Sequence, residues 1–533
     1  MAILQVVGTV ALLALTLTVV GAIRRLFFHP LAHIPGPKLA ALTWWYEFYF
    51  DVLQEGRYVF KIQELHKQYG SIIRVTPDEL HVNDVDFLDT VYAPSSSRRE
   101  KYEYQLRTLR VPGGVGASVS HEIHRKRREA LSPFFSKRNV LHLEPLITKK
   151  VNQLCEVITQ HAVAKTPVNL SDVFFAFSNE LRIPTEYRSM SLTEESVTTN
   201  FLFAHQTDIL SDETKAAALR QNSYELLKGI NINKHFPWLP DFLESLPLSI
   251  SKSIMPPGLI DMLALFDRVR AELIAIMKAK ASGIASEKPL GPTGKDSVYD
   301  SVLDSPILPP SEKALLRLEQ EGALLVLAGT ESPAKSLNII FYHLIANPSI
   351  LNKLRAELST VPRSASWTEL ERLPYLSAVI EEGNRLGFGV TARTARIAHE
   401  TLTYTQSPHA SSSPGGNKSY TIPPGTPISI TTLSAHTAES VFPNPFKFDP
   451  ERWFGEEGRE RRKFNMAFGK GGRKCLGIEL ARAELYLMTA ALVRRFDMQL
   501  WETDERDVAF VHDFQVTMPN FDSKGVRVTA KVM

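Results

Sequence analysis

The chain has 533 residues, of which 22% are charged and 44% are hydrophobic, and its formal net charge is only +3 at neutral pH. A charge this small selects no polyanionic partner, so composition gives no indication of nucleic-acid binding. The two cysteines, Cys155 and Cys475, lie too far apart in the sequence to form a Cys-x-x-Cys zinc pair or a disulfide framework.

The first segment of the chain is predicted to span a membrane. The run Ile3 to Ile23 is almost wholly apolar, and at about 1.5 Å per residue its helix is long enough to cross a hydrocarbon core of about 30 Å. Arg24 and Arg25 follow this run and no charged side chain precedes it, so the positive-inside rule places the rest of the chain in the cytosol. A cleaved signal peptide is the less favoured alternative, because the run is long and lacks a basic region before it.

The remainder predicts one large domain behind this segment. We expect a transmembrane signal anchor at residues 1–25, a Pro-rich linker at residues 26–40 and a single domain at residues 41–533. Helical patterns dominate this domain, and strand-like runs are fewer. The helices are expected at Ser311–Asn347, Pro348–Leu358, Pro374–Leu386 and Leu476–Arg495, and the strands at Ile72–Val75, Glu79–Val82 and Pro427–Leu433. The predicted fold class is therefore mainly α with a smaller β-rich lobe.

Two pairs of polar residues inside the predicted helices are candidates for a functional or structural role. Glu331 and Ser332 form an acid–alcohol pair at the centre of an apolar helix, directly before Pro333. Pro333 lacks an N–H and clashes with the carbonyl four residues earlier, so we expect a kink there. Glu382 and Arg385 are three residues apart on one helix face, a spacing that permits a salt bridge.

Cys475 lies in the run Phe-Gly-Lys-Gly-Gly-Arg-Lys-Cys-Leu-Gly at residues 468–477, which predicts a thiolate ligand. Heme iron needs one protein sulfur, so a single cysteine is enough. The glycines permit turns that a Cβ would block. Arg473 can pair with a propionate, Phe468 can shield the sulfur, and the free N–H groups at the start of Leu476–Arg495 can stabilise the thiolate. The alternative is a structural cysteine in a glycine turn.

These motifs resemble the cytochrome P450 family in identity and in order along the chain. The resemblance rests on the Cys475 run, on Glu382-x-x-Arg385, on the segment Phe-Asp-Pro-Glu-Arg-Trp that contains Arg452, and on the helix with Glu331 and Ser332. It extends over nearly the whole chain and is greatest with fungal microsomal members, including trichodiene-oxygenase-like monooxygenases of secondary metabolism. It implies the cytochrome P450 fold behind a single transmembrane helix, with residues 41–533 as the heme-thiolate catalytic domain.

The resemblance also implies roles for individual residues near the cofactor. Cys475 would be the axial thiolate ligand of heme b. On the oxygen side, Gly329 would open space for dioxygen, Glu331 would relay protons and Ser332, where threonine is usual, would supply the hydroxyl. Glu382, Arg385 and Arg452 would form a buried three-charge network. This network would position the chain segments that carry it and would add little to the stability of the fold. The expected cofactor-binding residues are Phe468, Arg473, His124, Arg128 and Arg396, with Arg393 as a rival to Arg396 for a propionate.

The implied reaction is an NADPH- and O2-dependent monooxygenation of an apolar small molecule, with a terpenoid secondary metabolite as the favoured substrate. A separate NADPH-cytochrome P450 reductase would deliver the electrons, because the chain contains no dinucleotide fingerprint of its own. Two alternatives are a reductase-independent heme-thiolate isomerase or dehydratase, and a non-enzymatic membrane-tethered heme-binding protein. The expected location is the endoplasmic reticulum membrane, with a single pass and a cytosolic catalytic domain.

Substrate identity is beyond what these motifs predict. The expected pocket walls are Leu106, Leu109, Val111, Phe201, Phe203, Leu210, Phe236, Trp238 and Phe242, and they indicate only an apolar substrate. The Ser/Pro/Gly-rich stretch from Thr405 to Lys418 cannot bury enough apolar area to offset the entropy of ordering, so we expect a surface loop between two strands.

Overall fold

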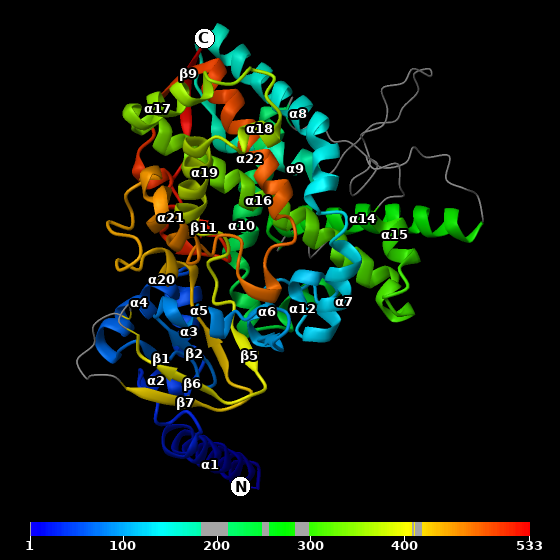
Figure 1. Ribbon diagram of the computed structural model, residues 1–533. Helices are drawn as coiled ribbons and strands as arrows, with labels where there is room; N and C mark the ends of the chain where they lie inside the picture. The colour runs from blue at the N-terminus through cyan, green and yellow to red at the C-terminus, as the bar shows by residue number, and fades with distance from the viewer. Residues whose placement is uncertain are drawn as a thin grey trace.

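The computed structural model describes residues 2–182, 210, 212–247, 255–282, 298–407, 410 and 418–533. Most of the molecule is helical, and a five-stranded sheet lies toward the end that carries helix α1 (Figure 1). The prediction of a mainly α fold with a smaller β-rich lobe is therefore confirmed. The α-helices are α1 (Ala2–Ile23), α2 (Lys38–Leu42), α3 (Trp45–Phe48), α4 (Tyr58–Tyr69), α5 (Leu88–Val91), α6 (Glu103–Leu106), α7 (His121–Leu131), α8 (Lys137–Ala164), α9 (Leu170–Arg182), α10 (Glu213–Gly229), α11 (Ile232–His235), α12 (Leu239–Ser245), α14 (Pro257–Ala281), α15 (Val298–Asp304), α16 (Leu315–Ala346), α17 (Pro348–Leu358), α18 (Trp367–Leu370), α19 (Pro374–Gly387), α20 (Thr432–His436), α21 (Gly455–Arg462) and α22 (Ile478–Arg495). The strands are β1 (Ile72–Arg74), β2 (Leu80–Val82), β3 (Arg99–Lys101), β4 (Val168–Asn169), β5 (Arg396–Ala398), β6 (Leu402–Thr405), β7 (Ser419–Ile422), β8 (Pro427–Ser429), β9 (Phe496–Leu500), β10 (His512–Asp513), β11 (Thr517–Met518) and β12 (Arg527–Val532).

Helix α16 is the centre of the helical part. It packs against α9, α14, α19 and α22, and its apolar side chains join the largest buried cluster of the described chain. The helix continues through Pro333, which is buried within it. Proline also starts the two helices that follow, because its missing N–H costs nothing in the first helical turn. Both α17 and α19 begin at the prolines that were predicted to open them.

The five-stranded sheet has the order β1-β2-β8-β5-β3. Strand β2 pairs with β8 in parallel, and the other neighbours are antiparallel. Ile428 of β8 lies opposite Leu80 of β2 on one side and Arg396 of β5 on the other. This register places Arg396 inside the sheet and brings β3 to its edge, beside the predicted cofactor residues.

One predicted strand is too long. The run from Pro427 to Leu433 was expected to be extended throughout, but β8 ends at Ser429 and a short helix, α20, begins at Thr432. The Thr431 hydroxyl accepts a hydrogen bond from the Ser434 amide at 3.2 Å, which caps this helix. Most of the predicted loop from Thr405 to Lys418 lies outside the described residues, but its flanking strands, β6 and β7, pair with each other.

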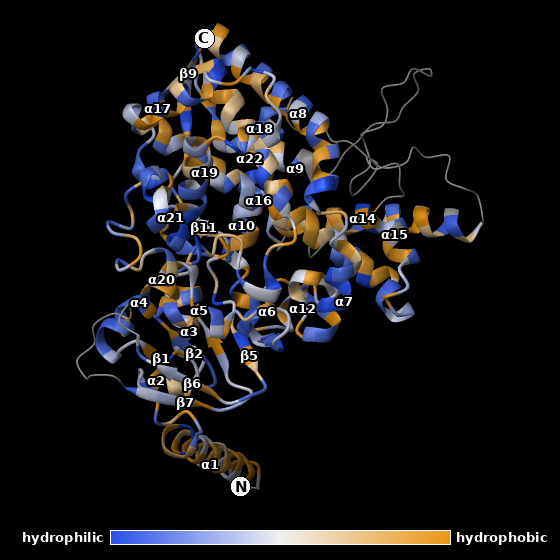
Figure 2. Ribbon diagram, viewed as in Figure 1, coloured by the Kyte–Doolittle hydropathy of each residue, from blue (hydrophilic) through white to orange (hydrophobic). Residues whose placement is uncertain are grey.

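The apolar N-terminal helix stands apart from the core. The α1 ribbon has mostly the hydrophobic colour of Figure 2, and its candidate membrane span, Ile3–Phe28, buries none of its most apolar window in the protein. The helix runs on as a π-helical turn over Arg24–Phe28, past the expected end of the anchor at residue 25. The linker that follows packs on the sheet, since Leu31 is buried and the Arg74 amide donates to the Pro35 carbonyl at 2.8 Å.

Candidate functional site

Cys475 lies at the end of a tight loop that leads into α22. The loop contains a 3-10 turn over Gly471–Arg473, and the Cys475 amide donates to the Phe468 carbonyl at 2.8 Å. The Cys475 side chain is exposed. Helix α22 begins at Ile478, so the thiol lies just before a helix N-terminus, where partial positive charge favours a thiolate.

The loop is held in place by close backbone contacts that only glycine allows. Gly471 has a φ of +68°, and a Cβ there would come within 2.1 Å of the Tyr92 carbonyl oxygen. The Gly472 amide donates to the Ala93 carbonyl at 3.0 Å. These contacts fix the loop against the segment that follows α5, as the glycine-rich sequence required.

A cavity of about 420 Å3 opens beside this loop and is lined mainly by basic side chains. His124 and Arg128 reach it from α7, Arg396 from β5 and Arg473 from the cysteine loop. The predicted cofactor-binding residues other than Phe468 therefore come together at one cavity. Phe468 lies in the same loop and is bonded through its carbonyl to Cys475.

The cations of this cavity are crowded and incompletely paired. Burial, reinforced by Arg396, lowers the pKa of Arg473 to about 9. Burial followed by the charge of Arg473 lowers the pKa of His124 to about 2, so its imidazole is neutral. Lys101 of β3, which sequence reasoning missed, also has a pKa well below its usual value because it is buried near Arg396 and Arg473. Such a concentration of positive charge favours an anionic ligand.

Arg473 has one N–H group that can donate a further hydrogen bond. Its two terminal nitrogens donate to the Ser118 carbonyl at 2.7 Å and to the Val119 carbonyl at 3.0 Å. Its Nε is buried and has no hydrogen-bond partner in the described structure. A buried donor of this kind is costly unless a ligand satisfies it. Arg128, by contrast, donates to the Lys474 carbonyl at 2.5 Å, next to Cys475.

Glu382, Arg385 and Arg452 form the three-charge network that was predicted. The Glu382 carboxylate accepts from Arg385 at 2.8 Å and from Arg452 at 3.0 Å. It also accepts from the Trp453 indole at 3.1 Å and from the Asp449 amide at 2.9 Å. Every guanidinium nitrogen of the two arginines has a partner, since backbone carbonyls accept from the remaining ones. The network ties α19 to the segment that precedes the cysteine loop.

Gly329, Glu331 and Ser332 lie midway along α16, which packs against α22. Glu331 accepts a hydrogen bond from the Ser223 hydroxyl of α10, a residue that sequence reasoning did not identify. Burial raises the pKa of Glu331 above its usual range, while Ser223, Arg220 and Lys335 oppose this rise. Ser332 is half-buried and lies one helical turn after the exposed Ala328.

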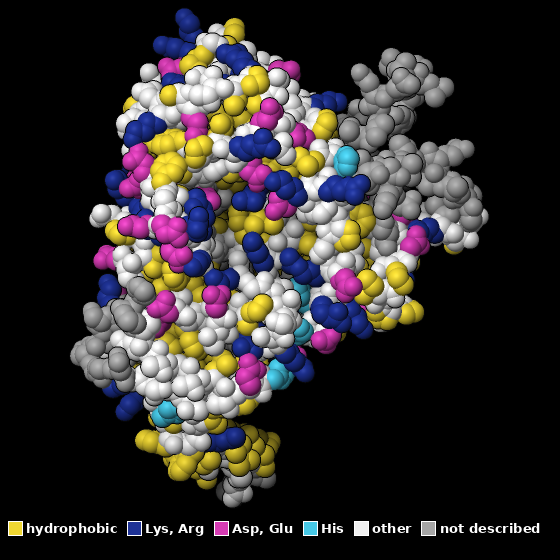
Figure 3. All heavy atoms as spheres, viewed as in Figure 1, with side chains coloured by type: hydrophobic (Ala, Val, Ile, Leu, Met, Phe, Trp, Pro, Cys, Tyr) yellow, Lys and Arg dark blue, Asp and Glu magenta, His cyan; other side chains and the backbone are white. Residues whose placement is uncertain are grey.

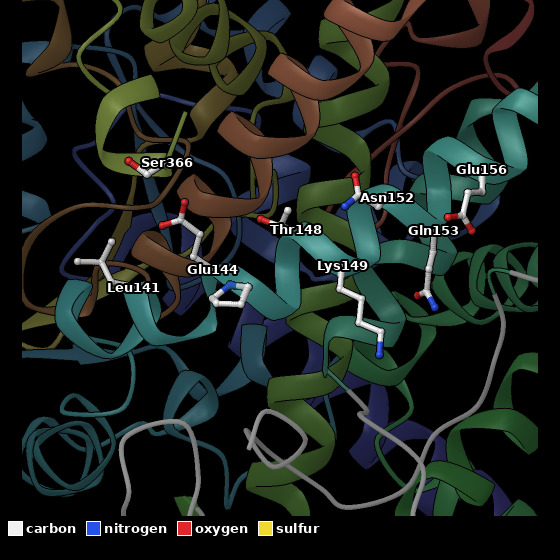
Figure 4. Close-up of a pocket in the computed structure, with 9 residues that line it drawn as sticks. Leu141, Glu144, Thr148, Lys149, Asn152, Gln153, Glu156 and Ser366 are labelled. Atoms are coloured by element: carbon white, nitrogen blue, oxygen red, sulfur yellow. The ribbon is translucent and has the colours of Figure 1, made fainter. Parts of the chain in front are cut away.

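A larger hollow of about 800 Å3 lies elsewhere, along the outer face of α8. Figure 4 shows Glu144, Thr148, Asn152 and Glu156 side by side along this helix, with Ser366 opposite. The lining contains none of the predicted site residues and presents mixed polar groups to solvent. We therefore place the functional site at the cysteine loop.

Comparison with known proteins agrees with this geometry. The cytochrome P450 family model matches residues 299–521. Cytochrome P450 monooxygenase tpcC of Cochliobolus heterostrophus is 36% identical over 522 residues, which cover 95% of this chain and 93% of that protein. Cytochrome P450 monooxygenase TRI4 of Trichoderma arundinaceum is 34% identical, with 92% and 88% covered. Tryptophan 6-hydroxylase fscE of Fusarium equiseti is also 34% identical, with 96% and 94% covered.

A solved structure resembles the whole fold. The crystal structure of a cytochrome P450, CYP102L1, superimposes with a TM-score of 0.65 at 17% identity, covering 90% of this chain and 96% of that one. This likeness shows the fold, and the relatives decide the family. The chain belongs to the cytochrome P450 family. It is an oxidoreductase of the P450 monooxygenase class, and the family implies heme iron held by a cysteine thiolate.

The residues of this P450 fit a heme group. Cys475 is its exposed cysteine, whereas Cys155 is buried and its thiol pKa is raised to about 11 by burial. A thiol with so high a pKa is a poor iron ligand. The unpaired Nε of Arg473 and the neighbouring cations suit propionate carboxylates. The donor set therefore matches one thiolate ligand and an anionic edge.

Arg393 does not belong to this cavity. Its guanidinium pairs with Glu47 at 2.6 Å and with Glu79 at 3.1 Å, and all three side chains are buried. These two carboxylates occupy the donors that a propionate would need. The suggestion that Arg393 rivals Arg396 is therefore wrong. No pattern in the sequence indicates this pairing, because Glu47 and Glu79 are distant from Arg393 along the chain.

Two of the expected pocket walls are also misplaced. Trp238 and Phe242 are 59% and 51% exposed, so they lie on the outer surface of α12 and its N-terminal end. Leu210 is buried, whereas Phe201 and Phe203 lie outside the described residues. The apolar character of Trp238 and Phe242 predicted burial, but both side chains are exposed in the structure.

Proposed function

We propose that this P450 binds heme b through Cys475 and inserts one oxygen atom from O2 into a C–H bond of an apolar small molecule. The observation that carries the proposal is the exposed Cys475 beside a cationic cavity in which Arg473 Nε has no partner among the described residues. Bound heme would supply the redox chemistry of oxygen activation. The protein would supply the iron ligand, the cationic partners of the propionates and the groups that deliver protons.

Each predicted residue has a task in this proposal. Cys475 Sγ would ligate the iron, with its charge stabilised by the N-terminus of α22. Arg473 and Arg396 would pair with the propionates. Neutral His124, whose pKa is about 2, would donate a hydrogen bond without adding charge.

Helix α16 would supply the residues that transfer protons. Glu331 would hold a proton on its carboxylate, and Ser332 Oγ would pass it on, with Gly329 leaving room for dioxygen. Replacing Ser332 with alanine removes the hydroxyl but not the fold. We expect Ser332→Ala to uncouple NADPH consumption from product formation. Ser336→Ala is the matched control, because the Ser336 hydroxyl one turn later donates to Asn384 at 2.8 Å and takes no part in the relay.

The favoured substrate class is a terpenoid of fungal secondary metabolism. Support comes from the resemblance to trichodiene-oxygenase-like enzymes and from the relative named TRI4. A relative of equal identity is named for the 6-hydroxylation of tryptophan, so aromatic substrates belong in the same test.

We further propose that the protein is anchored in the endoplasmic reticulum membrane by α1, with residues 41–533 as its cytosolic catalytic domain. The apolar surface of α1 and the exposed Trp45 and Trp238 support attachment at a lipid interface. Electrons would come from an NADPH-cytochrome P450 reductase. Lys and Arg side chains on the face that carries α7 and α22 (Figure 3) would suit the acidic surface of such a partner.

Co-expression with a reductase tests the reaction directly. The full chain should oxidise at least one member of a panel of terpenes, polyketides and aromatic amino acids, and the product should depend on both NADPH and O2. Turnover without NADPH would instead indicate a heme-thiolate isomerase or dehydratase. Heme binding without any turnover would contradict the monooxygenase assignment.

A further inference from the structure

The oxygen-side acid of α16 is held by a helix that carries none of the predicted site residues. Ser223 of α10 donates its hydroxyl hydrogen to Oε1 of Glu331. Glu331 and Ser223 are 108 residues apart, so only the packing of α10 over α16 brings them together. The contact fixes one carboxylate oxygen of a side chain that would otherwise turn about three single bonds.

The position of Ser223 is set by the neighbouring helix α14. The Asn222 side-chain amide donates to the Asp261 carboxylate at 2.8 Å. A Cβ on Gly258 would come within 1.9 Å of the Asn222 carbonyl oxygen, so α14 approaches α10 as closely as glycine permits. Asn222 is therefore fixed by its hydrogen bond to Asp261 and by the close approach of Gly258. Ser223 is the next residue, so its hydroxyl is held over α16.

The groups around Glu331 oppose one another. Burial favours its neutral form, whereas the Ser223 donor and the charges of Arg220 and Lys335 favour its ionised form. Burial raises the pKa of Tyr224 of α10, and the nearby charge of Glu331 adds to this rise. On the α9 side, Asp172 accepts from Arg220 at 2.5 Å and takes up part of that positive charge. Lys335, one turn beyond Glu331, has its pKa lowered to about 8 by burial.

We propose that Ser223 is a positioning residue for Glu331, and that its hydroxyl sets the pH at which this acid gains and releases its proton. The inference rests on the proposed function of Glu331 as a proton relay. A donor to the carboxylate stabilises the ionised form, so the Ser223 hydroxyl opposes the rise in the Glu331 pKa that burial causes and helps the acid to release its proton. Helix α10 thereby takes part in proton delivery through a residue that acts on the relay acid.

Infrared titration of the full-length holoprotein in detergent tests this directly. The carboxylic acid C=O band that is absent from Glu331→Gln reports protonation of Glu331. We expect Ser223→Ala to move the midpoint of this band upward by about one pH unit, because a donor to a charged group is lost. Ser223→Thr keeps a hydroxyl and should titrate near the wild type. An unchanged midpoint in Ser223→Ala would overturn the proposal.

A second variant keeps the test decisive if Ser223→Ala folds poorly. Ser223→Cys keeps a side chain of similar size but donates only weakly, so its midpoint should also rise. A midpoint that stayed at the wild-type value in Ser223→Cys would overturn the proposal equally. The outcome is separable from the proposed function, since the titration needs no substrate and no reductase. An enzyme that formed no product could still show the shift, and an active enzyme could lack it.

Discussion

At the scale of single residues, the arginines of the Glu382 network and those of the cationic cavity differ in how their donors are satisfied. In the Glu382 network each guanidinium nitrogen of Arg385 and Arg452 has an acceptor within the protein. In the cationic cavity, the buried Nε of Arg473 has no hydrogen-bond partner in the part of the chain that the structure describes. The first arrangement holds chain segments together, and the second suits a ligand, because a buried donor without an acceptor is costly.

Arg473 provides the first prediction. Arg473→Met keeps much of the side-chain volume but removes the charge, so heme binding should weaken on the order of 10- to 100-fold, as expected for a lost charge-assisted hydrogen bond. Heme transfer to apomyoglobin measures this loss. Lys470→Met is the control in the same loop, because Lys470 already pairs with Asp89 at 3.1 Å. Equal heme retention by Arg473→Met and the control would contradict the role of Arg473.

Glu382 provides the second prediction. Glu382→Gln leaves the buried cations Arg385 and Arg452 without their carboxylate, so the free energy of unfolding should fall by roughly 3–5 kcal/mol. Denaturant titration of the full chain measures it. The neighbouring Glu381 pairs with Arg462 at 2.9 Å where both are partly exposed, so Glu381→Gln should cost only ~0–1 kcal/mol. Similar losses in both variants would show that burial of the network is not the cause.

At the scale of elements, the helices α16 and α19 approach each other closely at a glycine. A Cβ on Gly383 would come within 2.2 Å of Ile340 Cγ1, in the buried core. Gly387, one turn later on α19, would meet nothing closer than the Ser336 hydroxyl at 3.6 Å. The crossing of the two helices therefore depends on one glycine and not on the other.

This difference gives the third prediction. Gly383→Ala should destabilise the protein by about 1–3 kcal/mol, because the added methyl group overpacks the interface. Gly387→Ala should be neutral or slightly stabilising, since alanine favours a helix. Thermal unfolding of both variants beside the wild type measures the contrast. A Gly387→Ala loss as large as that of Gly383→Ala would contradict the packing argument.

Local signals in the sequence predicted the elements well where they act within a few residues. The prolines that open α17 and α19 and the glycines of the cysteine loop act on their own backbone, so their positions could be read directly. The end of β8 was missed because Thr431, a good strand former, serves as a helix cap.

Contacts between distant residues could not be predicted in this way. The glutamates that neutralise Arg393 lie 346 and 314 residues away in the sequence. Lys101 near Arg396 and Arg473 and Ser223 beside Glu331 carried no motif, and only the packing of β3 and α10 brings them to the site. Buried polar partners of this kind follow from the tertiary fold and not from spacing.

At the scale of the whole molecule, α1 and the catalytic part are joined by a short packed segment. Arg25 donates to the Leu42 carbonyl at 2.5 Å and lies over the Trp44 ring at 5.1 Å. Helix α1 can therefore be removed up to Ile23 without disturbing these contacts.

Removal of α1 gives the fourth prediction. The full chain should resist carbonate extraction from membranes, and a chain lacking residues 2–23 should become extractable while it keeps its heme absorbance. Exposed aromatic residues such as Trp45 and Trp238 would leave only weak, reversible attachment. A truncated chain that stayed resistant to carbonate would show that another part of the molecule is the anchor.

The central claim is that Cys475 is the thiolate ligand of a heme group. The reduced carbon monoxide difference spectrum of the full chain tests it most directly, with Cys475→Ala, Cys475→His and Cys155→Ala beside the wild type. The wild type and Cys155→Ala should show the red-shifted absorbance of thiolate-ligated heme, and both Cys475 variants should lose it. A wild-type spectrum without that band, or a Cys475→Ala spectrum that retains it, would contradict the account.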